Sequence, residues 1–162
     1  MNIGLIFAGG SGVRMNTKGM PKQFLQMNGK AIIIHTLEYF EKCMDIDAIV
    51  VVCLKEYIGY LDNLLKINRI SKVKKIVPGG TCGQESIYHG LCAAEELAEG
   101  DDIVLIHDGV RPLISEDLLS NSIKMVKEKG NAITVTPATE TIIQADEKQT
   151  ITNIIDRKSC YI

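Results

Sequence analysis

A glycine-rich stretch near the start of the chain brings two basic side chains close together in sequence. Residues 5–15 read LIFAGGSGVRM, and residues 21–24 read PKQF. Three glycines follow a hydrophobic run, and because they lack side chains the backbone N–H groups can approach an anion closely. Arg14 can hold phosphate oxygens through two donors at once, whereas Lys22 supplies a mobile point charge. These residue types predict a loop that holds a triphosphate.

Two other nucleotide-binding motifs fit this stretch less well. The dinucleotide-binding motif needs a third glycine where Met15 stands, and it needs a helix to begin at once, which residues 16–21 disfavour. The Walker motif needs a lysine followed by serine or threonine, but Lys18 is followed by Gly19. For the glycines alone, a tight turn without a ligand is the plain alternative.

Size and charge limit the classes of partner. The chain has 162 residues, which fit one domain over residues 1–162, and 18 basic against 20 acidic residues give a net charge of −2. We expect no nucleic-acid partner, because the sequence has no basic block and no aromatic ladder. The five cysteines lack the short paired spacing of a zinc site, and the first apolar run is too short for a signal peptide or a membrane span. These features predict a reduced, cytoplasmic protein that does not bind membranes.

Strand-like and helix-like patterns alternate along most of the chain. Short runs rich in Ile and Val are typical of strands covered on both faces. They lie at residues 3–7, 48–53, 73–77, 103–107 and 132–136. Apolar residues recur near the helical period between the runs, at residues 33–40, 58–65, 87–97 and 119–126. The expected fold is α/β, with a doubly wound, mostly parallel sheet.

The last part of the chain has a different pattern. Residues 139–145 and 150–155 alternate around a polar turn at residues 146–149, which predicts a β-hairpin. An isolated hairpin is marginally stable in water, so this β-arm, over residues 137–158, should pack against something else. Packing on its own domain is the plain alternative.

Three polar segments should meet at one edge of the sheet. In doubly wound sheets ligands bind beyond the carboxyl ends of the strands. Residues 8–14, 78–86 and 108–111 each come directly after a predicted strand. We therefore expect all three segments on one rim, independently of any family likeness.

Four motifs in order resemble one enzyme family. FAGGSGVRM, PKQF, GGTCGQES at residues 79–86 and HDGVRP at residues 107–112 follow the order found in cytidylyltransferases that act on sugar-alcohol phosphates. The resemblance runs from residue 2 to about residue 157, and the family domain continues beyond residue 162. It implies a Rossmann-like nucleotidyltransferase fold and transfer of a cytidylyl group from CTP, with release of pyrophosphate. The expected acceptor is 2-C-methyl-D-erythritol 4-phosphate first and ribitol 5-phosphate second.

The resemblance also implies a role for individual residues. Arg14 and Lys22 would stabilise the transition state at the α-phosphoryl group. Residues that bind the nucleotide would be Ala8, Gly9, Gly10, Ser11, Gly79, Gly80, Thr81 and Ser86. Residues that bind the polyol phosphate would be Arg111, Glu140, Thr141 and Arg157. Asp108 would be the metal ligand, sharing Mg²⁺ with phosphate oxygens, and the arm would embrace a second subunit to form a homodimer.

The sequence departs from the family pattern at two positions and leaves alternatives open. Gly83 stands where the family commonly has arginine, and Glu140 where it more often has aspartate. Asp108 could simply form a turn, Arg157 could be a surface residue, and Cys82 could be a reactive thiol. Two other function classes remain: a catalytically defective remnant that binds nucleotide or dimerises, and a sugar-1-phosphate nucleotidylyltransferase that uses another nucleoside triphosphate. PKQF and HDGVRP argue against the second.

Overall fold

The structure is a computed structural model that describes residues 1–10 and 19–162. The chain divides into two compact units, residues 1–130 and residues 131–162, and each is described by itself. Ser11 and Arg14, two of the predicted site residues, lie outside the described residues. No helix in the described part of the chain is both long and apolar enough to cross a membrane.

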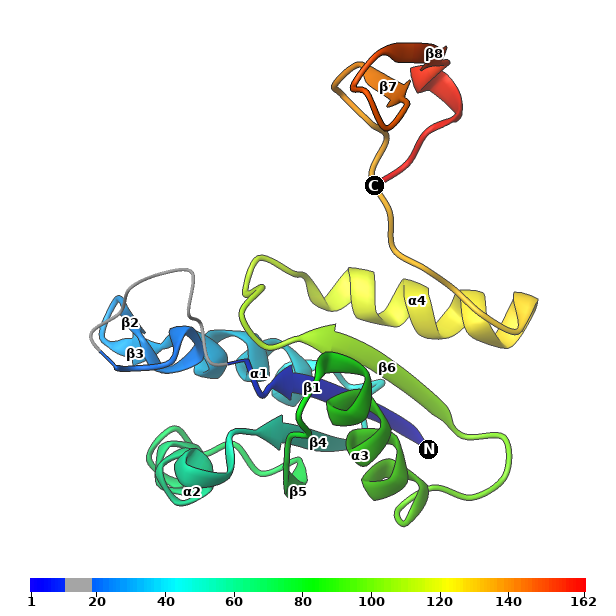
Figure 1. The fold of residues 1–162 in the computed structure, drawn as a ribbon. Coiled ribbons are helices and arrows are strands. Elements are labelled where there is room, and N and C mark those ends of the chain that lie inside the picture. The colour runs from blue at the N-terminus through cyan, green and yellow to red at the C-terminus, as the bar shows by residue number, and fades with distance from the viewer. Residues whose placement is uncertain (11–18) are drawn as a thin grey trace. The chain divides into compact units, whose positions relative to one another are not determined.

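The first unit is built on a four-stranded parallel sheet (Figure 1). Its strands are β1 (Asn2–Ala8), β4 (Ala48–Cys53), β5 (Val73–Pro78) and β6 (Ile103–Asp108). Their order in the sheet is β5-β4-β1-β6, so the chain moves outward from β1 to β5 and then crosses to the other side of β1. Strand β4 is buried along its whole length, as its continuous apolar sequence predicts.

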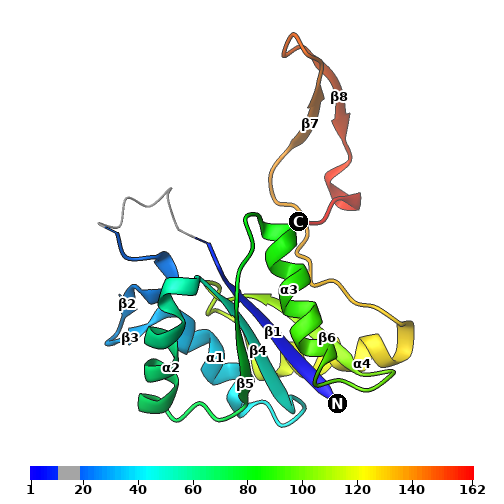
Figure 2. The ribbon, with the colours of Figure 1, turned by 60° about the horizontal axis from the view of Figure 1, so that its bottom comes forward.

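Helices cover both faces of this sheet (Figure 2). On one face α1 (Ile32–Lys42), α2 (Ile58–Ile67) and α4 (Glu116–Lys129) contribute to the larger apolar core. On the other face α3 (Gly83–Glu95) packs through Ala93 and Ala94 against the strands. The predicted α/β architecture is therefore confirmed, with a helix where each of the four helical patterns lies.

The ends of α4 show how the sequence sets a helix boundary. The Ser115 hydroxyl accepts a hydrogen bond from the Leu118 N–H at 3.2 Å, and Glu116 and Asp117 occupy the first turn. Gly130 ends the helix with φ of 87°, a left-handed conformation that glycine adopts without steric cost. Short elements complete the unit: η2 (Lys22–Phe24), β2 (Gln26–Met27), β3 (Lys30–Ala31) and η3 (Lys55–Tyr57).

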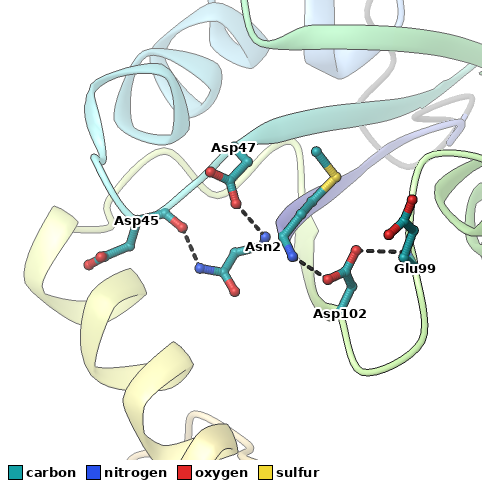
Figure 3. A network of polar contacts seen from close by, with 6 residues as sticks. Asn2, Asp45, Asp47, Glu99 and Asp102 are labelled. Atoms are coloured by element: carbon teal, nitrogen blue, oxygen red, sulfur yellow. Dashed lines mark hydrogen bonds and ion pairs between the residues drawn. The ribbon is translucent and has the colours of Figure 1, made fainter.

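A polar network joins the chain start to the loops around it (Figure 3). The Met1 amino group pairs with the Asp102 carboxylate, and this cation lowers the pKa of Asp102. The Asn2 N–H donates to the Asp47 carboxylate at 2.6 Å, and the Asn2 side chain donates to the Asp45 carbonyl at 2.7 Å. The network lies at the amino ends of β1, β4 and β6, opposite the edge on which the predicted site residues lie.

The second unit contains the predicted hairpin. Strands β7 (Ile142–Ala145) and β8 (Ile151–Ile155) pair antiparallel, and the Asp146 side chain accepts hydrogen bonds from Lys148 and Thr150 in the turn between them. The single-turn helix η4 (Arg157–Ser159) follows. The hairpin prediction is therefore confirmed.

The predicted strand at residues 132–136 is wrong. These residues form no regular strand, are exposed and belong to the second unit, and the parallel sheet ends at β6. Thr136 exchanges two backbone hydrogen bonds of 2.8 Å with Ile162 instead. An apolar, β-branched run is compatible with a strand, but it becomes one only where a neighbouring strand satisfies its backbone groups.

Candidate functional site

The loops after β1 and β5 meet at the carboxyl edge of the sheet. A Cβ atom placed on Gly9 would lie 3.8 Å from the Gly79 Cα and 3.7 Å from the Ser86 Oγ. Side chains at both glycines would therefore fill the space between the loops. The Gly79 N–H donates to the Cys53 carbonyl at 2.8 Å, so the last residue of β4 fixes the backbone of the loop after β5. The structure thus brings the described parts of the first two predicted segments together.

The side chains of Ser86 and Glu85 order the loop at residues 79–86 through hydrogen bonds within it. The Ser86 hydroxyl accepts from the Gly80 N–H at 3.0 Å and donates to the Cys82 carbonyl at 2.9 Å. The Glu85 carboxylate accepts from the Thr81 N–H at 2.5 Å and from the Thr81 hydroxyl at 2.7 Å, and these bonds lower the pKa of Glu85. Glu85 therefore orders this loop, a role that the sequence analysis did not assign to it.

These internal bonds determine what the loop can offer to a ligand. The N–H groups of Gly79, Gly80 and Thr81 all donate within the protein. Among the described residues, none donates a hydrogen bond to the carbonyls of Gly80 and Thr81. The loop therefore presents backbone acceptors, which suit an amino group such as that of a cytosine base.

The turn after β6 carries the third predicted segment. The Asp108 carboxylate accepts from the Val110 N–H at 3.2 Å and pairs with the Arg111 Nε at 3.2 Å. His107 Nε2 lies 3.0 Å from the Arg111 carbonyl, so the His107 ring also orders this turn. The turn-forming interpretation of Asp108 thus holds in the structure, and the exposed Arg111 guanidinium stands beside the carboxylate.

This turn is tightly joined to the start of the site. The Gly109 N–H donates to the Phe7 carbonyl at 2.7 Å, and the Thr36 hydroxyl donates to the Gly109 carbonyl at 3.0 Å. Phe7 pairs with Asp108 in the sheet register. Ala8 and the 108–111 turn therefore flank the point between β1 and β6 where the strand order reverses, the usual ligand position in such sheets.

Lys22 begins η2 and is half-buried. Its neighbour Gln23 is buried, and the Gln23 amide donates to the carbonyls of Ala8 at 2.5 Å and of Gly10 at 3.1 Å. The PKQF motif is thereby attached to the loop after β1. The sequence analysis assigned no role to the side chains of Gln23 and Thr36. No local pattern shows that either is buried, since Gln23 follows a lysine and Thr36 follows a histidine.

The second unit brings three predicted residues to one end of its hairpin. Arg157 donates from Nη1 to the Thr139 carbonyl at 2.9 Å, and Ile142 pairs with Ile155. Glu140 and Thr141 are exposed and lie directly after Thr139. Three of the four residues predicted to contact the polyol phosphate are therefore neighbours at the base of the arm, whereas the fourth, Arg111, belongs to the first unit.

The carboxylates, histidines and cysteines of the site decide whether it can hold a metal. In the described ranges no group of three or more His, Cys, Asp or Glu residues could hold an ion. Asp108 as a metal ligand therefore stays a prediction, which requires phosphate oxygens of the substrates to supply the other ligands of Mg²⁺. The half-buried Asp108 carboxylate lies at the end of β6 and pairs with the Arg111 guanidinium in this structure.

The cysteines near the site differ in character. Burial raises the pKa of the Cys53 thiol to about 11, which keeps it protonated at neutral pH. Cys82 is exposed, and its sulfur accepts from the Glu85 N–H at 3.5 Å as the N-cap of α3.

Comparison with known proteins identifies the family. The sequence model of the IspD family, described as 2-C-methyl-D-erythritol 4-phosphate cytidylyltransferase, matches residues 3–162. The chain belongs to the IspD family of cytidylyltransferases. A solved relative with this fold is 4-diphosphocytidyl-2C-methyl-D-erythritol synthase from Anaerococcus prevotii, with a TM-score of 0.81 and 24% identity over 100% of this chain and 66% of that one.

Two curated IspD-family relatives differ in acceptor. A ribitol-5-phosphate cytidylyltransferase from Streptococcus agalactiae serotype III is 51% identical over 162 residues, which is all of this chain and 68% of the relative. A 2-C-methyl-D-erythritol 4-phosphate cytidylyltransferase from Lachnospira eligens is 35% identical over 161 residues, or 99% of this chain and 69% of the relative. This IspD-family chain thus spans about two thirds of the length of these relatives.

Proposed function

We propose that this chain binds CTP at the carboxyl edge of its sheet and transfers the cytidylyl group to ribitol 5-phosphate. The observation that carries the proposal is the meeting of the loops after β1 and β5, with the Asp108–Arg111 turn beside them, in an IspD-family chain. The acceptor follows the 51% identity to a ribitol-5-phosphate cytidylyltransferase, against 35% for the L. eligens 2-C-methyl-D-erythritol 4-phosphate enzyme. This reverses the order of acceptors expected from the sequence.

In the proposed reaction a phosphate oxygen of the polyol phosphate attacks the α-phosphorus of CTP. A new P–O bond forms, the bond from the α-phosphorus to the bridging oxygen breaks, and pyrophosphate leaves with that electron pair. Negative charge gathers around the α-phosphoryl group, so cationic side chains supply most of the stabilisation. No nucleophilic side chain is needed.

The described residues take distinct parts in this reaction. Lys22, held beside the β1 loop by Gln23, would neutralise charge at the α-phosphoryl group. The carbonyls of Gly80 and Thr81 would accept from the cytosine amino group. Arg111 would bind phosphate, and Asp108 would hold Mg²⁺. Bound Mg²⁺ would draw negative charge from the phosphate oxygens.

Residues outside this group complete the proposal. As the family resemblance implies, Arg14 would stabilise the transition state at the α-phosphoryl group, and Ser11 would bind the nucleotide. Glu140, Thr141 and Arg157 would bind the polyol phosphate from the arm. The arm also supports a proposed homodimer, because Ile143, Ile151 and Ile154 are exposed on a hairpin that is too small to be stable alone.

Pyrophosphate release tests the proposed function. Purified chain is assayed with CTP and Mg²⁺ plus either ribitol 5-phosphate or 2-C-methyl-D-erythritol 4-phosphate, and ATP, GTP and UTP serve as controls for the base. We expect release with CTP and ribitol 5-phosphate. Thermal stabilisation by CTP without release would instead indicate a chain that only binds nucleotide. Preference for UTP or GTP would indicate another nucleotidylyltransferase.

A further inference from the structure

We propose that Gln23 and Thr36 are positioning residues that hold the two loops of the site in the arrangement that cytidylyl transfer requires. The inference rests on the proposed function and adds residues to it. Gln23 is 2% exposed and Thr36 is fully buried. Within the part of the chain that the structure describes, they are the only buried polar side chains. Both side chains donate hydrogen bonds to backbone carbonyls of the site loops.

Gln23 acts on the loop after β1. Its amide nitrogen donates one hydrogen bond to the Ala8 carbonyl at 2.5 Å and a second to the Gly10 carbonyl at 3.1 Å. These carbonyls lie on either side of Gly9, the residue next to Gly79. Because Gln23 directly follows Lys22, the same side chain fixes the backbone of Lys22 relative to the loop. An ionised carboxylate could not replace it, since it has no hydrogen to donate.

Thr36 lies on α1 and contacts the turn after β6, at Gly109, which is 73 residues later in the chain. Its hydroxyl donates to the Gly109 carbonyl at 3.0 Å, while the Gly109 N–H donates to the Phe7 carbonyl at 2.7 Å. A Cβ on Gly109 would lie only 2.8 Å from the Phe7 oxygen. The peptide groups around Gly109 are thus held from both sides, immediately next to Asp108.

Burying a polar group has a free-energy cost unless it is hydrogen-bonded, so an apolar residue would be the simpler choice at either position. Here both polar groups bond to the loops that carry the site. A purely structural role would affect stability alone. A positioning role also affects the order of these loops and the rate of transfer, because small displacements of reacting groups are costly.

The test compares four variants with the wild-type chain. Thr36→Val keeps the shape but loses the donor, Thr36→Ser keeps the donor, and Gln23→Met keeps approximately the length without the amide. Ile34→Val is the matched control, because it removes one buried methyl group from the same helix as Thr36. Amide hydrogen exchange is followed at residues 8–10 and 108–111, together with CTP affinity and pyrophosphate release.

We expect Thr36→Val to speed exchange at Gly109 and Arg111 and to lower kcat about tenfold or more, with little change in KM for CTP. Thr36→Ser should restore both readouts. Gln23→Met should speed exchange at residues 8–10 and weaken CTP binding about tenfold. Ile34→Val should change only the melting temperature.

Two results would overturn the inference. One is unchanged exchange at both loops in Thr36→Val and Gln23→Met, whatever the activity. The other is a loss of activity no greater than that of Ile34→Val, or not restored by serine. A wild-type chain that neither binds CTP nor releases pyrophosphate would contradict the proposed function instead, and the exchange data would still decide whether the loops are held.

Discussion

Lys22 lies on a short helical turn whose next residue, Gln23, is anchored to the loop after β1. Replacing Lys22 by methionine should lower kcat about 100-fold, because it removes one cation from the place where negative charge develops. The free energy of unfolding should change by less than about 1 kcal/mol, since a partly exposed charge contributes little to folding. Pyrophosphate release and thermal unfolding measure the two effects.

The matched control for this change is Lys124→Met on α4, where the lysine is exposed and the helix carries no proposed site residue. It should leave both quantities unchanged. Turnover of Lys22→Met within threefold of wild type would remove Lys22 from the proposed mechanism.

Single residues also show how far the sequence could predict the site. The position of the described glycines, Asp108 and Arg111 at the carboxyl edge of the sheet was predictable, because their segments follow apolar runs that become strands. The parts played by Glu85, Gln23 and Thr36 were not, because each depends on a backbone group that only the folded chain places within reach. Local patterns identify which residues could do chemistry, and tertiary contacts decide which residues support them.

Helix α3 packs closely on the sheet at Gly90. A Cβ there would lie 2.6 Å from Leu5 Cδ1 and 2.7 Å from Val52 Cγ2, both on fully buried side chains. Gly90→Ala should therefore destabilise the protein by about 1–3 kcal/mol. Gly59→Ala in α2 is the control, since its Cβ meets nothing within 4 Å and alanine favours the helix by about 1 kcal/mol. Chemical denaturation of both variants checks this, and equal stabilities would contradict it.

Glu41 joins α1 to the segment before β5. Its carboxylate accepts from the Ser71 N–H and hydroxyl and from the Lys72 N–H, at 3.0, 2.5 and 2.8 Å. Partial burial raises the pKa of Glu41, but these hydrogen bonds outweigh it and hold the pKa below the ordinary 4.5. The ionised form therefore stabilises the fold above pH 4.5, and this contribution is lost as the pH falls through the lower folded value.

The corresponding variant is Glu41→Gln. Its melting temperature should be below that of wild type at pH 7, and the gap should close as the pH falls below 4.5. Glu128→Gln, at an exposed position of α4, is the control and should show no gap at pH 7. A gap for Glu41→Gln that stays constant from pH 7 to acid pH would contradict this assignment.

At the level of elements, the sequence predicted most of the first unit. Helices and strands with a clear period and a covered face were placed correctly, because the same apolar residues form the two cores. Residues 132–136 were misplaced, since their pattern contains no information about which strand lies beside them. Pairing partners are a property of the whole fold.

For the whole molecule, the arm is the feature that points to a partner. Ile143 and Ile154 face each other across the hairpin and are 47% and 67% exposed. Ile154→Asp should convert a dimer to a monomer, because burying a carboxylate in an apolar interface is costly. Light scattering coupled to size-exclusion chromatography measures this. Lys148→Ser in the hairpin turn is the control, and a monomeric wild-type chain would contradict the proposed dimer.

The most direct test is a crystal structure of the chain with CTP and Mg²⁺ at saturating concentration. We expect the triphosphate beside Lys22 and the loop after β1, and the cytosine amino group against the carbonyls of Gly80 and Thr81. CTP bound elsewhere, or a carboxyl edge of the sheet that holds no nucleotide, would contradict the proposed function.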